Sequence, residues 1–357
     1  MIKPSIKPVL LALALAAALP ASQALTFQFN DVTAGGMRAE QLAAFNAAAN
    51  IWSSRLSDPV TVYIDISFAS LPPHVLGGTN LTSTSASYST VRALLAADAT
   101  SALDASAVAH LQAGPALTFR ATQGDLTTRL DNDGSVNNQL LGVTTANAKA
   151  MGLAVATDAA HPDAGIQFGS YFDTNNAFSY SRAGGAAPGK YDFISVAEHE
   201  IGHALGFVSG VDDIDYCAGA ANRCQLANPN SATTFENAAW YTPLDLFRYS
   251  ANGVLDLRVG QAAYLSTDGG ATAVASMSTG QFNGDGYQAS HFIFSQLALM
   301  RPGVPSGVAY DLTAEDLAAM DAIGWNTSPV PEPQTPALML LGLIGLAGLR
   351  ARRRARR

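Results

Sequence analysis

The 357-residue sequence has few cysteines, few charges and no long apolar run. Its two cysteines exclude a cysteine-rich disulfide framework and a four-cysteine metal site. Charged residues make up 13% of the chain, too few for a charge-rich disordered segment or a heptad rod. No apolar run reaches the roughly 20 residues that cross a bilayer as a helix. Because 48% of the residues are hydrophobic, we expect a globular protein.

Positive charge is scarce between the two ends of the chain. Without Lys3, Lys7, Glu332 and the six arginines after residue 349, the chain has 12 basic and 27 acidic residues, a formal charge of −15. Nucleic-acid binding needs lysine and arginine to neutralise phosphates. The charge therefore predicts no nucleic-acid partner.

The first 24 residues predict a secretory signal. Lys3 and Lys7 form a basic start, an apolar run extends from Val9 to Leu19, and small residues lead to Ala24. We place cleavage by signal peptidase after Ala24. The mature chain is then expected outside the cytoplasm.

The C-terminal residues 328–357 predict a sorting and anchor segment. Pro331-Glu332-Pro333 precedes an apolar stretch from Ala337 to Leu349 and the arginine cluster. The side chains of the arginines can reach the membrane surface and so extend the span of this short stretch. We therefore expect a transmembrane helix that anchors the protein transiently, with its arginines in the cytoplasm. The order resembles the PEP-CTERM sorting signals of Gram-negative bacteria, which an exosortase recognises and removes. The resemblance implies export across the inner membrane, then sorting to the cell surface or extracellular matrix.

The two cysteines lie seven positions apart in a polar segment rich in glycine and asparagine. In an exported chain, Cys217 and Cys224 are expected to form a disulfide that closes this small loop.

Between the two end segments, hydrophobic periodicity divides the chain into a part that mixes helices and strands and a part rich in loops. Strands are predicted at 25–30, 60–68 and 164–172, and helices at 38–56, 88–111 and 312–325. Residues 207–327 are otherwise rich in loops, and no internal repeat is present. We therefore expect an α+β fold.

A short motif with metal-binding spacing lies in the segment YDFISVAEHEIGHALGF. His199-Glu200-Ile201-Gly202-His203 matches H-E-x-x-H, for which this composition gives roughly 0.002 chance matches. On a helix, His199 and His203 share a face and can chelate one cation, while Glu200 can reach a water on it. Gly206 can end the helix with a positive φ.

Two histidines bind zinc weakly, so a catalytic site needs a third ligand and one open position. Ser209, three positions after Gly206, is a poor zinc ligand. The remaining histidines are His74, His110, His161 and His291; the first three lie upstream in a turn, a helix and a loop, where we expect structural or exposed roles. Carboxylates also bind zinc, so the sequence leaves Asp212, Asp213 and Glu236 open as alternatives to His291.

The body resembles the metzincin clan, most closely its leishmanolysin-like arrangement, in which a long insertion precedes the third histidine. The resemblance implies a zincin-like fold: a twisted mixed sheet with an active-site helix in residues 25–206, and a loop-rich subdomain in residues 207–327. It implies His291 as third ligand and Met300 as the methionine of the turn beneath the metal. Pro302 stands where that pattern can place a tyrosine, so no oxyanion stabiliser is predicted.

These observations predict a secreted zinc endopeptidase acting on proteins or peptides. Three imidazoles would hold one Zn²⁺, which activates water, and Glu200 would be the general base. The strand at 164–172 is the candidate sheet edge for pairing with the substrate, and Glu198 is expected to be a solvated charge. The alternative is a catalytically inactive zincin-fold protein that binds a surface or matrix.

Overall fold

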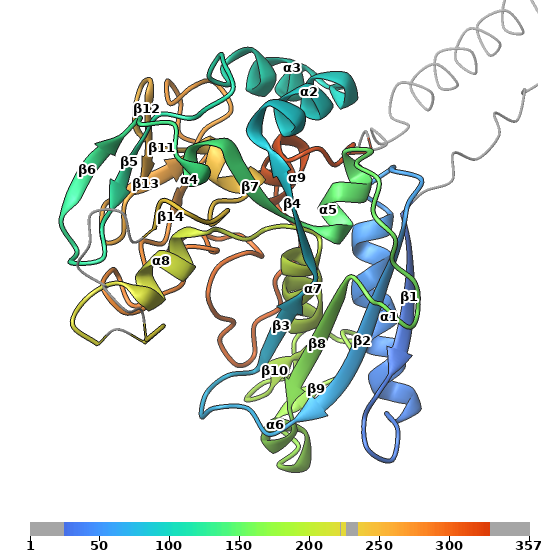
Figure 1. Ribbon diagram of the computed structural model, residues 1–357. Helices are drawn as coiled ribbons and strands as arrows, with labels where there is room; N and C mark the ends of the chain where they lie inside the picture. Colours follow the sequence, from blue (N-terminus) through green and yellow to red (C-terminus); the bar gives the residue numbers. More distant parts are fainter. Residues whose placement is uncertain (1–24, 222, 226–234, 329–357) are drawn as a thin grey trace, which may run out of the picture.

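A computed structural model describes residues 25–221, 223–225 and 235–328 (Figure 1). The chain opens with strand β1 (Thr26–Asp31), helix α1 (Ala39–Ser53) and strand β2 (Thr61–Ala69). In β2, Val62, Ile64 and Ile66 are buried, because alternate side chains of a strand point to the same face. The strand and helix order predicted for this region is confirmed.

A four-stranded sheet has the order β1-β2-β8-β3. Strands β1, β2 and β8 (Ala164–Gly169) are parallel, and β3 (Gly77–Leu81) pairs antiparallel with β8. The prediction that 164–172 forms a sheet edge is therefore wrong. β8 ends at Gly169 and lies between β2 and β3, because the short segment at 77–81, rich in glycine and polar residues, forms the edge strand instead.

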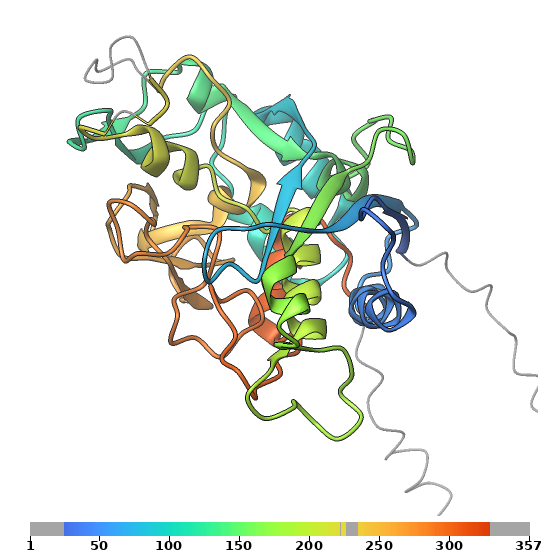
Figure 2. The same ribbon diagram turned by 90° about the horizontal axis from the view of Figure 1, so that it is seen from below.

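Helix α7 (Phe193–Ala204) packs against this sheet and against α1. Phe193 begins the helix with its ring centre 4.5 Å from that of Phe168 in β8. The Trp52 indole of α1 donates a hydrogen bond of 2.8 Å to the Glu198 carbonyl oxygen. In both views α7 lies between α1 and a second sheet (Figures 1 and 2).

The second sheet has six strands in the order β14-β13-β11-β12-β5-β6. Its strands come from segments both before and after Gly206 in the sequence, and the two groups join where β12 pairs in parallel with β5. The bounds are β5 Phe119–Thr122, β6 Thr128–Asp131, β11 Arg248–Ala251, β12 Val254–Leu257, β13 Ala263–Leu265 and β14 Ala275–Met277.

The remaining strands form two small sheets of two strands each. Strands β4 and β7 pair antiparallel, and β9 and β10 pair in parallel. The strand bounds are β4 Ser83–Ser87, β7 Leu140–Thr144, β9 Phe178–Ser179 and β10 Tyr191–Asp192. The helices are α2 Tyr88–Asp98, α3 Ala102–Ala109, α4 Val136–Gln139, α5 Thr145–Ala150, α6 Ser170–Thr174, α8 Val211–Cys217, the 3₁₀ helix η1 Pro243–Phe247, and α9 Ala314–Ala322.

The helix predicted over 88–111 is two helices, α2 and α3. Ser101 caps α3, and its hydroxyl accepts a hydrogen bond from the Asp104 backbone N–H, so the chain restarts a helix there. The apolar spacing alone does not reveal this break. The closing helix expected within 312–325 is confirmed as α9.

Within the described ranges, no helix combines the length and apolarity needed to span a bilayer. The predicted secretory signal (1–24) and the predicted anchor (Ala337–Leu349) lie outside the described residues.

Candidate metal centre

Helix α7 begins and ends as its sequence suggests. The Asp192 carboxylate accepts a hydrogen bond of 2.9 Å from the Ser195 backbone N–H and so caps the helix. Gly206 ends it with φ +115°, a conformation that side chains rarely adopt. A Cβ atom at Gly206 would also lie 2.9 Å from the Asn147 Cβ. Glycine is thus required at this position for both conformation and space.

Three histidines from two distant segments of the chain meet at helix α7. The Nε2 atoms of His199 and His203 are 3.0 Å apart, and each is 3.2 Å from the Nε2 of His291. Among the described residues they are the one group of three or more His, Cys, Asp or Glu whose ligand atoms all lie within 4.8 Å of one another. The structure therefore brings together the three histidines named from the sequence.

The second nitrogen of each ring is held by a backbone carbonyl. The Nδ1 atoms of His199, His203 and His291 lie 2.9, 2.7 and 3.2 Å from the carbonyl oxygens of Leu299, Phe207 and Gln288. A carbonyl only accepts, so each Nδ1 carries the proton and each Nε2 presents a lone pair. Burial keeps the rings neutral, since it lowers the pKa of His199 to about 4 and that of His203 to about 3.

These donors fit a tetrahedral metal ion. Zinc binds imidazole at about 2.0–2.1 Å, which places two ligand nitrogens about 3.3 Å apart in a tetrahedron. The observed 3.0–3.2 Å is close to that spacing. Three neutral imidazoles whose other nitrogen bonds to a carbonyl also match the outer-shell pattern of metal-binding histidines. The residues present thus fit a zinc ion with one open position.

Two of the three carboxylates left open as alternative ligands have other partners. Asp212 accepts hydrogen bonds from the backbone N–H groups of Ala289 and Ser290, at 2.5 and 3.1 Å. Glu236 forms a 2.5 Å ion pair with Arg129. Asp212 therefore holds the segment that carries His291, a role that the sequence did not reveal.

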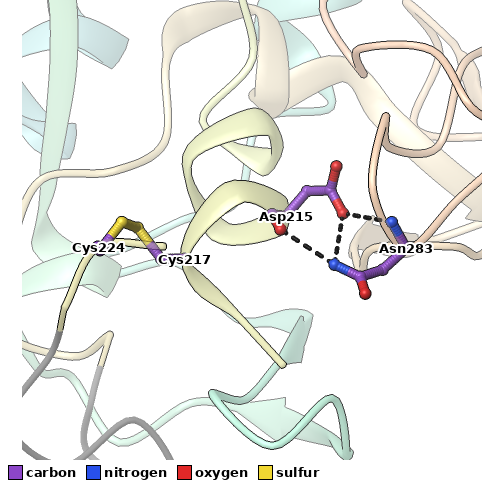
Figure 3. Close-up of a disulfide and its surroundings, with 4 residues drawn as sticks. All are labelled: Asp215, Cys217, Cys224 and Asn283. Atoms are coloured by element: carbon purple, nitrogen blue, oxygen red, sulfur yellow. Dashed lines mark hydrogen bonds between the residues drawn. A yellow bond between two sulfur atoms is a disulfide. The ribbon is translucent and has the colours of Figure 1, made fainter. Parts of the chain in front are cut away.

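Helix α8 is the support for that segment. Besides Asp212, its Asp215 carboxylate accepts a hydrogen bond from the backbone N–H of Phe282. It also accepts hydrogen bonds from both nitrogens of Asn283 (Figure 3). Cys217, at the end of α8, forms the predicted disulfide with Cys224. The 282–291 segment is thus held at two points by one helix.

Glu200 lies beside the histidines and is 6% exposed. Burial raises the pKa of its carboxyl group to about 7, although a hydrogen bond of 2.7 Å from the Thr79 hydroxyl opposes this shift. Gly77 leaves space for the side chain, since a Cβ there would lie 3.0 Å from the Glu200 Cγ. Thr79 and Gly77 both belong to β3, and neither contact was predicted from the sequence pattern.

Met300 is fully buried beneath α7. A Cβ atom at Gly202 would lie 2.5 Å from the Met300 Sδ, so the absence of a side chain at Gly202 allows this packing. The Asp316 carboxylate at the start of α9 accepts hydrogen bonds from the backbone N–H of Leu299 and Met300, at 2.9 and 3.0 Å. The methionine and the carbonyl that supports His199 thus belong to one anchored turn.

The expectation that Glu198 is a solvated charge is wrong. Its side chain is fully buried, and burial raises its pKa to about 8. The Arg182 guanidinium lies 3.7 Å away, and the Leu312 backbone N–H donates to Glu198 at 3.1 Å. Because Arg182 and the 310–312 segment lie against this side chain, a position that appears polar on an isolated helix is interior.

The histidines and Glu200 line a cleft of about 870 Å³. Edge strand β3 forms part of its wall, through Gly77, Gly78, Thr79 and Leu81. No other strand of the described residues pairs with the outer edge of β3. The other three histidines are exposed and stay outside the three-histidine group: His74, His110 and His161.

Comparison with known proteins identifies the C-terminal signal. Residues 329–356 match the PEP-CTERM protein-sorting motif, which marks an exported protein destined for surface sorting in Gram-negative bacteria by exosortase-type machinery. No curated protein and no solved structure matches the chain. The chain thus carries a PEP-CTERM sorting motif after the domain that holds the candidate metal centre.

Proposed function

We propose that this protein is an exported zinc-dependent endopeptidase with a zincin-like fold. The observation that carries the proposal is the meeting of three Nε2 lone pairs from His199, His203 and His291 beside the buried carboxyl group of Glu200. Zinc bound there would polarise the scissile carbonyl and lower the pKa of a bound water towards about 7.

The residues around this centre have complementary roles in peptide hydrolysis. Glu200 accepts a proton from the attacking water and delivers it to the leaving amine. The Thr79 hydroxyl donates to Oε2 of Glu200 and fixes the direction of the carboxylate. Oε1, the other carboxylate oxygen, is the atom that receives the proton.

Strand β3 supports a peptide substrate in particular. Its outer edge, which pairs with no other strand of the described residues, borders the cleft that contains Glu200. An extended peptide can add to a free sheet edge through backbone hydrogen bonds, which places a peptide bond beside the centre without requiring a particular side chain. This geometry favours an endopeptidase over an enzyme for a small substrate.

The first experiment measures zinc content and peptide hydrolysis in the same protein. We expect one zinc per chain, hydrolysis that stops on chelation, and recovery when zinc is restored. Glu200→Ala should keep the zinc and lose hydrolysis by roughly 10²–10⁴-fold, the usual contribution of a general base.

The same variant separates the enzyme from an inactive binding protein. Undiminished hydrolysis in Glu200→Ala would refute the assigned base. Stoichiometric zinc without hydrolysis of any peptide in the wild-type protein would favour the inactive zincin-fold protein that binds a surface or matrix.

A further inference from the structure

Arg301 is a buried cation in the wall of the cleft. It follows Met300 directly and is 6% exposed. It is the one lysine or arginine among the described residues that line this cleft. The other charged side chains of the lining are acidic: Glu200, Asp212 and Asp213.

Two aromatic side chains hold the guanidinium group in place. Its carbon lies 4.2 Å from the ring centre of Phe294 and 5.1 Å from that of Tyr310. Nη1 also donates a hydrogen bond of 2.7 Å to the Tyr310 hydroxyl. The Tyr310 backbone N–H in turn donates to the Ser195 hydroxyl on α7, at 2.8 Å. The guanidinium is therefore fixed relative to the helix that carries the histidines.

This cation has no counter-charge within the described residues. Arg301 forms no ion pair with any of their carboxylates, and its Nε is buried without a hydrogen-bond partner. Outside them the sequence has a single acidic residue, Glu332 of the sorting motif. Arg182, by contrast, pairs with Asp192 at 2.8 Å. Burying an unpaired charge is unfavourable, and a bound anion would supply the missing counter-charge. Arg301 is therefore suited to bind an anion.

We propose that Arg301 binds a carboxylate of the peptide substrate, an inference that rests on the proposed function. A guanidinium offers a planar fork that matches the two oxygens of a carboxylate. The acidic side chains elsewhere in the cleft repel an anion, so the carboxylate of the substrate lies at Arg301. That group is either an aspartate or glutamate side chain of the substrate or its C-terminal carboxylate.

Matched peptides test this specificity. Each pair carries Glu or Gln at one position near the cleaved bond, and each peptide is made with a free and with an amidated C-terminus. We expect kcat/KM to be roughly ten- to a hundredfold higher for the carboxylate form at one of these places, as for a charge-assisted hydrogen bond. A preference at an internal position identifies a side chain, and a preference for the free terminus identifies the C-terminal carboxylate.

Two substitutions assign the preference to Arg301. Arg301→Met should abolish it, and Arg301→Lys should keep part of it, because the charge remains but the fork is lost. Arg120→Met is the matched control: Arg120 is exposed on β5 outside the cleft, and its loss changes net charge equally. Persistence of the preference in Arg301→Met, or its absence from the wild-type protein, would overturn the proposal.

A binding measurement separates this inference from the proposed function. The Glu200→Gln protein should bind the preferred carboxylate peptide about ten times more tightly than its neutral partner, measured by fluorescence anisotropy. Equal affinities for every pair would overturn the role of Arg301 even if peptides are cleaved. Selective binding without hydrolysis by the wild-type protein would overturn the peptidase and leave the carboxylate site standing.

Discussion

The tautomer of each histidine decides what the cluster can bind. With Nδ1 committed to a carbonyl, His199, His203 and His291 can present only a lone pair at Nε2. Lone pairs 3.0–3.2 Å apart have no proton between them and repel one another. A cation at their centre relieves this repulsion, whereas protonation of the rings is disfavoured by burial. The cluster is therefore suited to a metal ion.

Loss of the distant histidine is the sharpest test at this scale. His291→Ala should reduce zinc content from one per chain to a small fraction at the same free zinc concentration, because two histidines alone bind zinc weakly. Zinc per folded chain can be measured by mass spectrometry of the metal. His161→Ala is the control, since His161 is exposed and outside the cluster. Unchanged zinc content in His291→Ala would require a different third ligand.

At the scale of elements, α8 determines where His291 lies. The Asp212 carboxylate binds two consecutive backbone N–H groups immediately before His291, and burial raises its pKa to about 6. An asparagine would offer one acceptor oxygen in place of two and would present N–H donors to groups that are themselves donors. The segment would then lose part of its anchor.

Asp212→Asn should therefore weaken zinc binding by roughly 10–100-fold without abolishing it, as for other outer-shell partners. Competition with a chromophoric chelator measures the change. Asp213→Asn is the matched control, because Asp213 is adjacent and exposed. Complete loss of zinc in Asp212→Asn would instead identify Asp212 as a ligand.

Local patterns predicted helix α7 but not its surroundings. The spacing of His199 and His203 and the position of Gly206 follow from helix periodicity, which a sequence displays directly. Strand β3 has glycine and polar residues without apolar alternation, so its place at the sheet edge depends on tertiary pairing with β8. The burial of Glu198 likewise depends on elements far away in the chain.

At the scale of the whole molecule, the histidine cluster joins two segments that lie far apart in the chain and belong to different elements. His199 and His291 are 92 residues apart, one on α7 and the other on a loop held by α8. A ligand that binds all three histidines can bind only when these parts are assembled. Metal binding is thus coupled to the stability of the complete fold.

Zinc should accordingly raise the unfolding temperature of the full chain. At free zinc a thousandfold above the dissociation constant, linkage adds about 4 kcal/mol to the free energy of unfolding, which corresponds to roughly 6 °C for a domain of this size. Scanning calorimetry with and without a chelator measures the shift. His291→Ala should lose most of this temperature shift, because a variant that does not bind zinc is not stabilised by it. Glu200→Ala keeps all three imidazoles and should retain the shift. An equal shift in wild type and His291→Ala would mean that zinc stabilises the protein from another place.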